Sequence, residues 1–113
     1  MKKIEAVIRP QSLDKVLLAL EEAGYPGVMV TEIEGHGRQK GVAQQWRGQE
    51  YKVNLLPKVK LEVVVTDKAL HAIVAKIEQA SKTGQIGDGK IFVSDISNVV
   101  RIRTGETGDA ALN

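Results

Sequence analysis

Apolar and polar residues alternate at two places along the chain. Between residues 3 and 9, Ile4, Ala6 and Ile8 fall at every second position. Such a period of two is typical of a β-strand with one buried face. Residues 58–65 repeat the pattern, with Val59, Leu61, Val63 and Val65 on one face and Lys58, Lys60, Glu62 and Val64 on the other. Each stretch is therefore predicted to be a strand.

Two other stretches carry the helical period. Apolar residues recur three and four positions apart after Ser12 and again after Asp67. Both side chains suit a helix N-cap, where an oxygen accepts a first-turn N–H. Gly24 and Gly84 are predicted to end the two helices. The apolar stripes are Leu13, Val16, Leu17 and Leu20 in the first helix and Leu70, Ile73, Val74 and Ile77 in the second.

β-Branched residues predict two further strands, at 28–34 and 91–96. Residues 98–103 are predicted to form a short last strand, and the polar run 104–109 a mobile tail. The order is then strand, helix, strand, strand, helix, strand. That order indicates an α+β, ferredoxin-like βαββαβ sandwich, and 113 residues suit a single domain.

Both helices should cover one face of the sheet, which leaves the other face open. Val7, Val64 and Phe92 are predicted on that open face. Because bare apolar surface usually marks an interface, we expect an oligomer that buries it. The alternative is a face of mixed polarity that simply meets water.

Residues 35–56 break the pattern. Their apolar positions have no period, and the stretch is largely polar with one large aromatic, Trp46. A compact domain rarely contains about twenty residues without secondary structure unless they serve function or are disordered. A long functional or disordered loop is predicted here.

Composition excludes several classes. The net charge of +2 is nearly balanced, which argues against a protein that coats nucleic acid. The chain has no cysteine, so disulfides and thiolate metal sites are excluded. No apolar run reaches membrane-spanning length, and Glu5 falls where a signal peptide needs an apolar core. A soluble cytoplasmic protein is expected.

Candidate chemistry is concentrated in residues 83–90. Three glycines in six positions leave backbone N–H groups exposed, and Lys90 closes the run. Arg101 and Arg103 would point the same way in an extended segment. Backbone donors, a lysine and paired guanidiniums suit a polyphosphate. The alternative is a plain glycine turn that binds nothing.

The same run approaches a P-loop without matching it. Gly84 to Lys90 fits the glycine and lysine spacing, but Ile91 stands where Ser or Thr should bind magnesium. A strand is predicted after the run, whereas a P-loop opens a helix. A P-loop ATPase is therefore not implied.

Several motifs together resemble the nitrogen regulatory protein P-II family. They are Gly35–Gly41, Tyr51, Leu56–Lys60, Thr83–Val93 and Arg101–Glu106, in the family's order and without a gap. The resemblance implies a homotrimer that binds ATP or ADP between subunits, and 2-oxoglutarate together with Mg-ATP. It places a T-loop at about 37–55 between strands 2 and 3, a B-loop at 83–90 and a C-terminal loop at 101–113.

The resemblance also implies roles for individual residues. Gln39 would ligate magnesium with ATP, and its neutral oxygen suits a cation already balanced by phosphates. The residues implied for nucleotide binding are Val7, Gly35, Gly37, Arg38, Val64, Gly87, Asp88, Gly89, Lys90, Arg101 and Arg103. Those implied for 2-oxoglutarate are Gln39, Lys40, Gly41, Lys58 and Gly87. Without the resemblance, Lys58 would be interpreted as part of a solvated strand face.

Partners are implied in the same way. Arg47 falls near the loop tip, where relatives insert an arginine into an ammonium channel. Tyr51 falls where some relatives carry a uridylyl group, and an unmodified tyrosine is the alternative. The implied targets are an ammonium transporter or nitrogen-assimilation enzymes, with recruitment to the membrane by the channel. Met29 and Trp46 depart from the common pattern, which bears on adenine contacts and on partner choice.

Two alternatives come from other classes. An RNA-binding module on this fold would stack bases on sheet aromatics, and only Phe92 is available on a strand. A small phosphohydrolase would need a nucleophile and a base, and no convincing pair is present. We therefore expect a regulatory protein rather than an enzyme, with slow ATP turnover at most.

Overall fold

The computed structural model describes residues 1–36, 42–46, 49–53 and 55–112. These described residues form six strands, two α-helices and two short 3-10 helices. In order they are β1 (Lys2–Ile8), η1 (Pro10–Ser12), α1 (Leu13–Glu22), β2 (Met29–His36), β3 (Val42–Trp46), β4 (Gln49–Val53), β5 (Leu55–Val65), α2 (Leu70–Ser81), β6 (Gly89–Asp95) and η2 (Gly108–Ala111).

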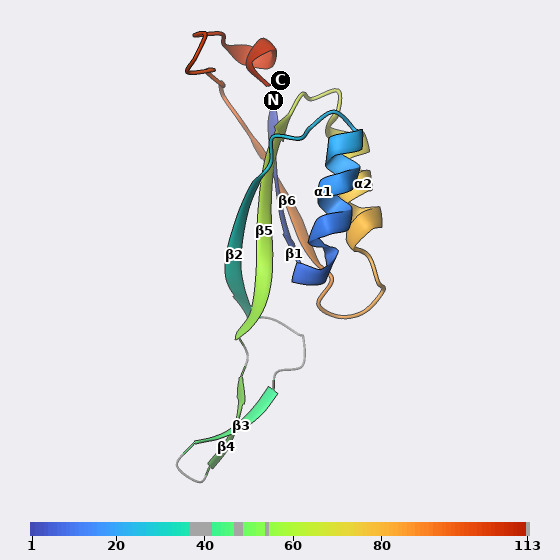
Figure 1. Ribbon diagram of the computed structural model, residues 1–113, viewed down its shortest axis with the longest axis vertical. Helices are drawn as coiled ribbons and strands as arrows, with labels where there is room; N and C mark the ends of the chain where they lie inside the picture. The colour runs from blue at the N-terminus through green and yellow to red at the C-terminus, as the bar shows by residue number, and fades with distance from the viewer. Residues whose placement is uncertain (37–41, 47–48, 54, 113) are drawn as a thin grey trace.

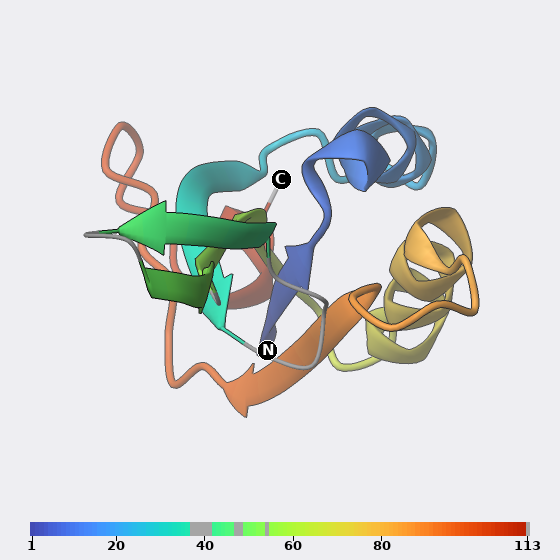
Figure 2. The same ribbon diagram turned by 90° about the horizontal axis from the view of Figure 1, so that it is seen from below.

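The main sheet has four antiparallel strands in the order β2-β5-β1-β6. Both α-helices lie on one face of it (Figure 1), and the end-on view separates the two layers clearly (Figure 2). This arrangement confirms the predicted ferredoxin-like α+β fold. No helix in the described ranges is long and apolar enough to cross a membrane.

The core lies between the sheet and the helices. The strand side chains predicted to face inward are almost completely buried on β1 and β5, with Ala6, Leu61 and Val65 at 0% exposure. Val16 and Leu20 from α1 and Ile73 and Ile77 from α2 pack against them. Each fully buried aliphatic side chain contributes roughly 1.5–3 kcal/mol. The alternation in the sequence therefore located the core correctly.

The N-cap of α1 is Ser12, as predicted, but without the predicted capping bond, and the N-cap of α2 is Ala69 rather than Asp67. Ser12 precedes α1, but its backbone is already helical (φ −88°, ψ −10°) and its side chain makes no capping bond. An N-cap side chain reaches the first turn from an extended backbone, which Ser12 does not have. Asp67 accepts a hydrogen bond from the amino group of Met1 at 2.8 Å, and Thr66 Oγ1 accepts the Ala69 N–H instead.

The stretch 35–56 is less irregular than its sequence indicates. β2 continues to His36, β5 begins at Leu55, and these two residues pair. Between them β3 and β4 form an antiparallel hairpin, which Figure 1 shows beyond the end of the main sheet. β3 and β4 form a sheet of their own, so the alternation that marks the strands of the main sheet does not identify them. The expectation of a stretch without secondary structure was therefore wrong for these strands.

The open face of the sheet is more polar than predicted. Strand register places Lys3, Glu5, Lys60 and Glu62 on it, with ion pairs Lys3–Glu5 at 2.8 Å and Lys60–Glu62 at 3.1 Å. Phe92 lies on the same face and is 53% exposed. The charged residues agree with the alternation predicted at 58–65 and with the alternative of a face of mixed polarity, while Phe92 lies on this face as predicted. Oligomerisation stays a prediction.

The C-terminal segment forms turns rather than a strand. Val100 and Thr107 make an isolated bridge, and residues 102–104 lie in a turn. The Arg101 N–H donates to Glu106 O at 2.8 Å, and η2 follows. Gly105 has a φ of +74°, which only glycine adopts readily. The predicted last strand at 98–103 is therefore wrong, and the predicted mobile tail contains hydrogen-bonded turns.

Candidate functional site

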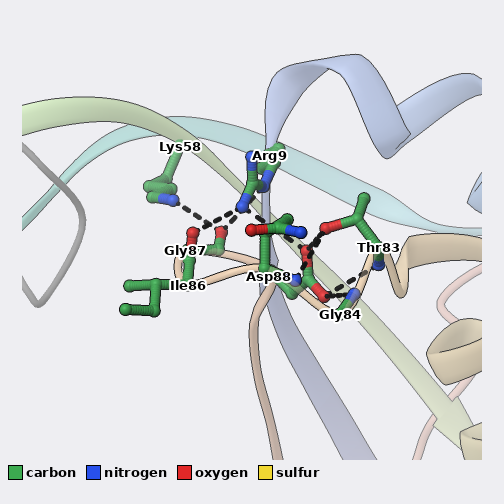
Figure 3. Close-up of polar contacts among 8 residues, drawn as sticks. Arg9, Lys58, Thr83, Gly84, Ile86, Gly87 and Asp88 are labelled. Carbon is green, nitrogen blue, oxygen red and sulfur yellow. Dashed lines mark hydrogen bonds and ion pairs between the residues drawn. The ribbon is translucent and has the colours of Figure 1, made fainter.

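The loop between α2 and β6 is built around one carboxylate. Asp88 Oδ2 accepts the N–H groups of Thr83 at 2.8 Å and Gly84 at 2.9 Å, and its Oδ1 accepts the Thr83 hydroxyl (Figure 3). These donors, the Thr83 hydroxyl first, hold the pKa of Asp88 below its ordinary value. Asp88 therefore closes the loop from within, which the sequence did not predict.

Two cationic side chains from the sheet donate hydrogen bonds to the same loop. Arg9, just after β1, donates through Nε to Gly87 O at 3.1 Å and through Nη2 to Ile86 O at 2.6 Å. Lys58, from β5, donates through Nζ to Gly87 O at 2.9 Å. Figure 3 shows both side chains converging on these carbonyls. The loop tip is thus tied to two neighbouring strands.

These contacts bring the positive charges of Arg9 and Lys58 close together at a partly buried position. Burial and, secondly, the charge of Arg9 lower the pKa of Lys58, while Asp88 partly offsets them. Arg9 Nη2 also lies 3.5 Å from Asp88 Oδ1. One carboxylate that is already hydrogen-bonded faces two cations. A carboxylate beside Lys58 would offset the effect of Arg9 on its pKa.

Glycine is required where the loop enters β6. Gly89 has a φ of +112°, and a β-carbon there would lie 1.8 Å from the carbonyl oxygen of Val7. Val7 pairs with Lys90 across the β1–β6 ladder. Gly87 also has a positive φ, of +101°. The backbone of the loop can therefore approach β1 only because these positions lack side chains.

The structure brings together one part of the predicted site. Lys58, Gly87, Asp88 and Gly89 are adjacent, with Val7 and Lys90 beside them. Gly35 pairs with Leu56, two positions from Lys58 on β5. Val64 lies toward the other end of β5, opposite Lys3. Tyr51 lies in β4, and six predicted residues fall outside the described ones, namely Gly37, Arg38, Gln39, Lys40, Gly41 and Arg47.

Arg101 and Arg103 are not part of this cluster. They follow the far end of β6, so the strand separates them from the glycine loop within one chain (Figure 1). Arg101 pairs with Glu106 and donates to Ala110 O at 3.1 Å. Arg103 lies in a turn, so the two guanidiniums do not share one side of an extended segment. The predicted extended segment at Arg101 and Arg103 was therefore wrong, whereas their role at a nucleotide bound between subunits stays a prediction.

Sequence reasoning missed Arg9. It follows an alternating strand and precedes a proline, a position that carries no local signal of a role. Only the folded chain brings it to Ile86 and Gly87, which are 77 and 78 positions away. The missing information was long-range contact rather than residue type.

Comparison with known proteins assigns the family. A sequence model described as "Nitrogen regulatory protein P-II" matches residues 1–106. The chain belongs to the P-II family. It is 60% identical over 108 residues to the "Nitrogen regulatory protein P-II" of Mesorhizobium japonicum, which covers 96% of each chain.

Two further relatives are similar over nearly the whole chain. The "Nitrogen regulatory protein P-II 1" of Escherichia coli K12 is 54% identical over 112 residues, covering 99% of this chain and all of that protein. The "Nitrogen regulatory protein P-II 2" of Methanothermobacter thermautotrophicus is 51% identical over 112 residues, covering 99% and 97%. Membership of this family supports a regulatory role in nitrogen signal transduction.

Proposed function

We propose that this P-II protein reports nitrogen and carbon status by binding ATP or ADP and, together with Mg-ATP, 2-oxoglutarate. It passes that state to an ammonium channel or to nitrogen-assimilation enzymes through the segment between β2 and β5. The observation that carries the proposal is the hydrogen bond from Lys58 Nζ to Gly87 O, at 2.9 Å. This bond joins the glycine loop to the strand that leaves that segment.

The glycine loop supplies the phosphate end of the proposed nucleotide site. Gly87 and Gly89 keep the backbone bare, and the exposed Lys90 adds a point charge. Arg101 and Arg103 would complete the site from another copy of the chain, because they lie at the far end of β6 in their own. A strand of seven residues spans roughly 20 Å, too far for a guanidinium to reach back. The site is therefore proposed to be shared between copies of the chain, and the resemblance to the P-II family implies that these copies form a homotrimer.

Lys58 supplies the proposed contact to 2-oxoglutarate. Its ammonium group is partly buried and already next to Arg9, so a carboxylate would be a better partner than the neutral Gly87 carbonyl. Gln39 would ligate magnesium, and Lys40 and Gly41 would complete the keto-acid site. Binding would then exchange a protein contact of Lys58 for a ligand contact.

This exchange of Lys58 contacts would change the conformation of the segment between β2 and β5. Lys58 is three residues from Leu55, which pairs with His36 where β2 and β5 lead into the segment. A ligand that contacts both Lys58 and the residues after His36 interacts differently with each arrangement of the segment. Such a difference is what shifts a conformational population. Arg47 and, where it is uridylylated, Tyr51 would then meet the partner.

The RNA-binding alternative meets an obstacle on the sheet. Phe92 is exposed, but its partner on β1 and on the same face is Glu5, a carboxylate already paired with Lys3. A sheet that binds RNA stacks bases on several aromatic rings, and Glu5 offers none beside Phe92. The described face therefore favours the regulatory function.

Calorimetry tests the proposal directly. The full chain is titrated with ATP, ADP and 2-oxoglutarate in all combinations, with and without magnesium. The expected result is saturable nucleotide binding, and 2-oxoglutarate binding only when Mg-ATP is present. Equal affinity for 2-oxoglutarate with and without nucleotide would refute the coupling.

A further inference from the structure

A cleft of about 390 Å³ lies on the helix side of the glycine loop. Its apolar wall is Ile8, Val74 and Ile91, and its rim is formed by Glu78, Ser81, Lys82, Asp88, Gly89 and Lys90. Ile8 belongs to the core under the helices, whereas Lys58 reaches the loop from the β5 side. The loop thus has a second accessible wall, at the end of α2. The volume falls near the low end of the range for small-molecule pockets, about 300–1,000 Å³.

The rim carries one charge of each sign at the end of α2. Glu78 and Lys82 are four residues apart, so they project from the same side of the last turn. Within the described part of the chain, neither side chain forms an ion pair or hydrogen bond with the other or with a neighbour. Glu78 and Lys82 are both exposed. Both charges are therefore available to a ligand.

Backbone groups reinforce this polarity. The carboxyl end of α2 carries the negative pole of the helix, which favours a cation near Glu78. β6 is an edge strand that pairs only with β1 in the described sheet, so its outer edge offers backbone donors and acceptors near Gly89 and Lys90. The cleft thus combines an apolar wall with separate places for a positive and a negative group.

We propose that this cleft is a second small-molecule site, which takes a zwitterion with a short apolar body, the chemistry of an aliphatic α-amino acid. The ammonium group would lie against Glu78, and the carboxylate against Lys82, whose own positive charge offsets the negative pole at the end of α2. The aliphatic side chain would pack on Val74 and Ile91. A purely anionic ligand would leave Glu78 without an opposite charge, and a purely cationic ligand would leave Lys82 without one.

Occupancy would also act on the glycine loop. Asp88 and Gly89 line the cleft and belong to the glycine loop. Arg9 and Lys58 contact this loop from its other side. A ligand packed against them would restrain the loop and so alter its affinity for nucleotide. This coupling rests on the proposed function, whereas binding in the cleft does not.

The test compares leucine with two analogues that each lack one charge. The full chain is titrated calorimetrically with L-leucine, with isoamylamine, which lacks the carboxylate, and with 4-methylpentanoate, which lacks the ammonium group. We expect saturable leucine binding, and at least about tenfold weaker binding of both analogues. Methyl shifts in the NMR spectrum should appear at Val74 and Ile91. The absence of saturable leucine binding, or shifts confined to other residues, would overturn the proposal.

Variants assign the two charges. Glu78→Gln should weaken leucine and isoamylamine binding but not that of 4-methylpentanoate, and Lys82→Gln should show the opposite analogue pattern. Glu21→Gln and Lys15→Gln, on the exposed side of α1, serve as matched controls and should bind like the original chain. Unchanged leucine binding in both cleft variants would refute the assignment. ATP is titrated into the same samples, so failure here with normal ATP binding leaves the proposed function intact.

Discussion

A β-carbon on Gly89 would lie 1.8 Å from the carbonyl oxygen of Val7, so the glycine loop enters β6 through a gap that admits no side chain. The φ of +112° adds strain for any other residue. Two independent features therefore require glycine at one position. They also explain how the loop backbone comes so close to β1.

Gly89→Ala should destabilise the protein. Steric overlap with β1 backbone and the left-handed conformation together should cost about 3 kcal/mol or more, since such backbone strain alone costs of order 1–3 kcal/mol. Gly27→Ala is the control, because its added β-carbon meets nothing within 4 Å and its φ is not positive. Urea unfolding at equal protein concentration measures both variants. Equal midpoints would show that the loop can move away from β1 without loss.

The carboxylate of Asp88 should stabilise the loop in a pH-dependent way. Its hydrogen bonds with Thr83 and Gly84 hold the folded pKa below the ordinary 3.8, so the contribution is present above that value. It should disappear as the pH falls through 3.8 toward the lower folded pKa. The measurement is the melting-temperature difference between the original chain and Asp88→Asn from pH 7 downward.

At neutral pH the original chain should melt at a higher temperature than Asp88→Asn, and at acid pH the difference between their melting temperatures should approach zero. Glu22→Gln is the control, because Glu22 is exposed on α1. A difference that grows on acidification would contradict the assignment, as would a constant difference across the titration.

Arg9→Lys should loosen the loop although it keeps the charge. The guanidinium bonds to the carbonyls of Ile86 and Gly87 at once, and a single ammonium group cannot reproduce that fork. Loss of one bond, worth about 1 kcal/mol, should accelerate amide hydrogen exchange in residues 85–87 about fivefold. Lys15→Arg on α1 is the control. Unaltered exchange in Arg9→Lys would show that charge alone positions the loop.

Lys58→Gln should separate the two ligands of the proposed function. Loss of the ammonium group removes the contact to the keto-acid carboxylate, so 2-oxoglutarate affinity should fall at least about tenfold. ATP affinity should change much less. Lys60→Gln is the matched control, since Lys60 lies on the same strand face and pairs with Glu62. Equal losses in the two variants would mean that the general charge of this face, rather than Lys58, recruits the ligand.

Local patterns account for most of the fold. Alternation at 3–9 and 58–65 predicted β1 and β5 and identified their buried residues, because a strand with one buried face must alternate. The helical stripes were equally informative. The N-caps at Ser12 and Asp67 were not, because both positions have a suitable residue type, whereas capping also requires a suitable backbone conformation and a free side chain.

The sequence by itself determined the strand and helix order, the core and the glycine run, since each depends on residues near one another along the chain. Only the tertiary structure decided that Asp88 accepts hydrogen bonds from within its own loop and that Arg9 and Lys58 bond to that loop. It also decided that Arg101 lies away from the loop in its own chain. It also revealed the β3–β4 hairpin, whose strands pair with each other outside the core. The contacts of Arg9 and Lys58 join distant segments, and residue spacing carries no information about contacts across 77 positions. The Asp88 bonds and the hairpin are local, but residue type alone does not say which side chain bonds to the backbone or which short strands pair.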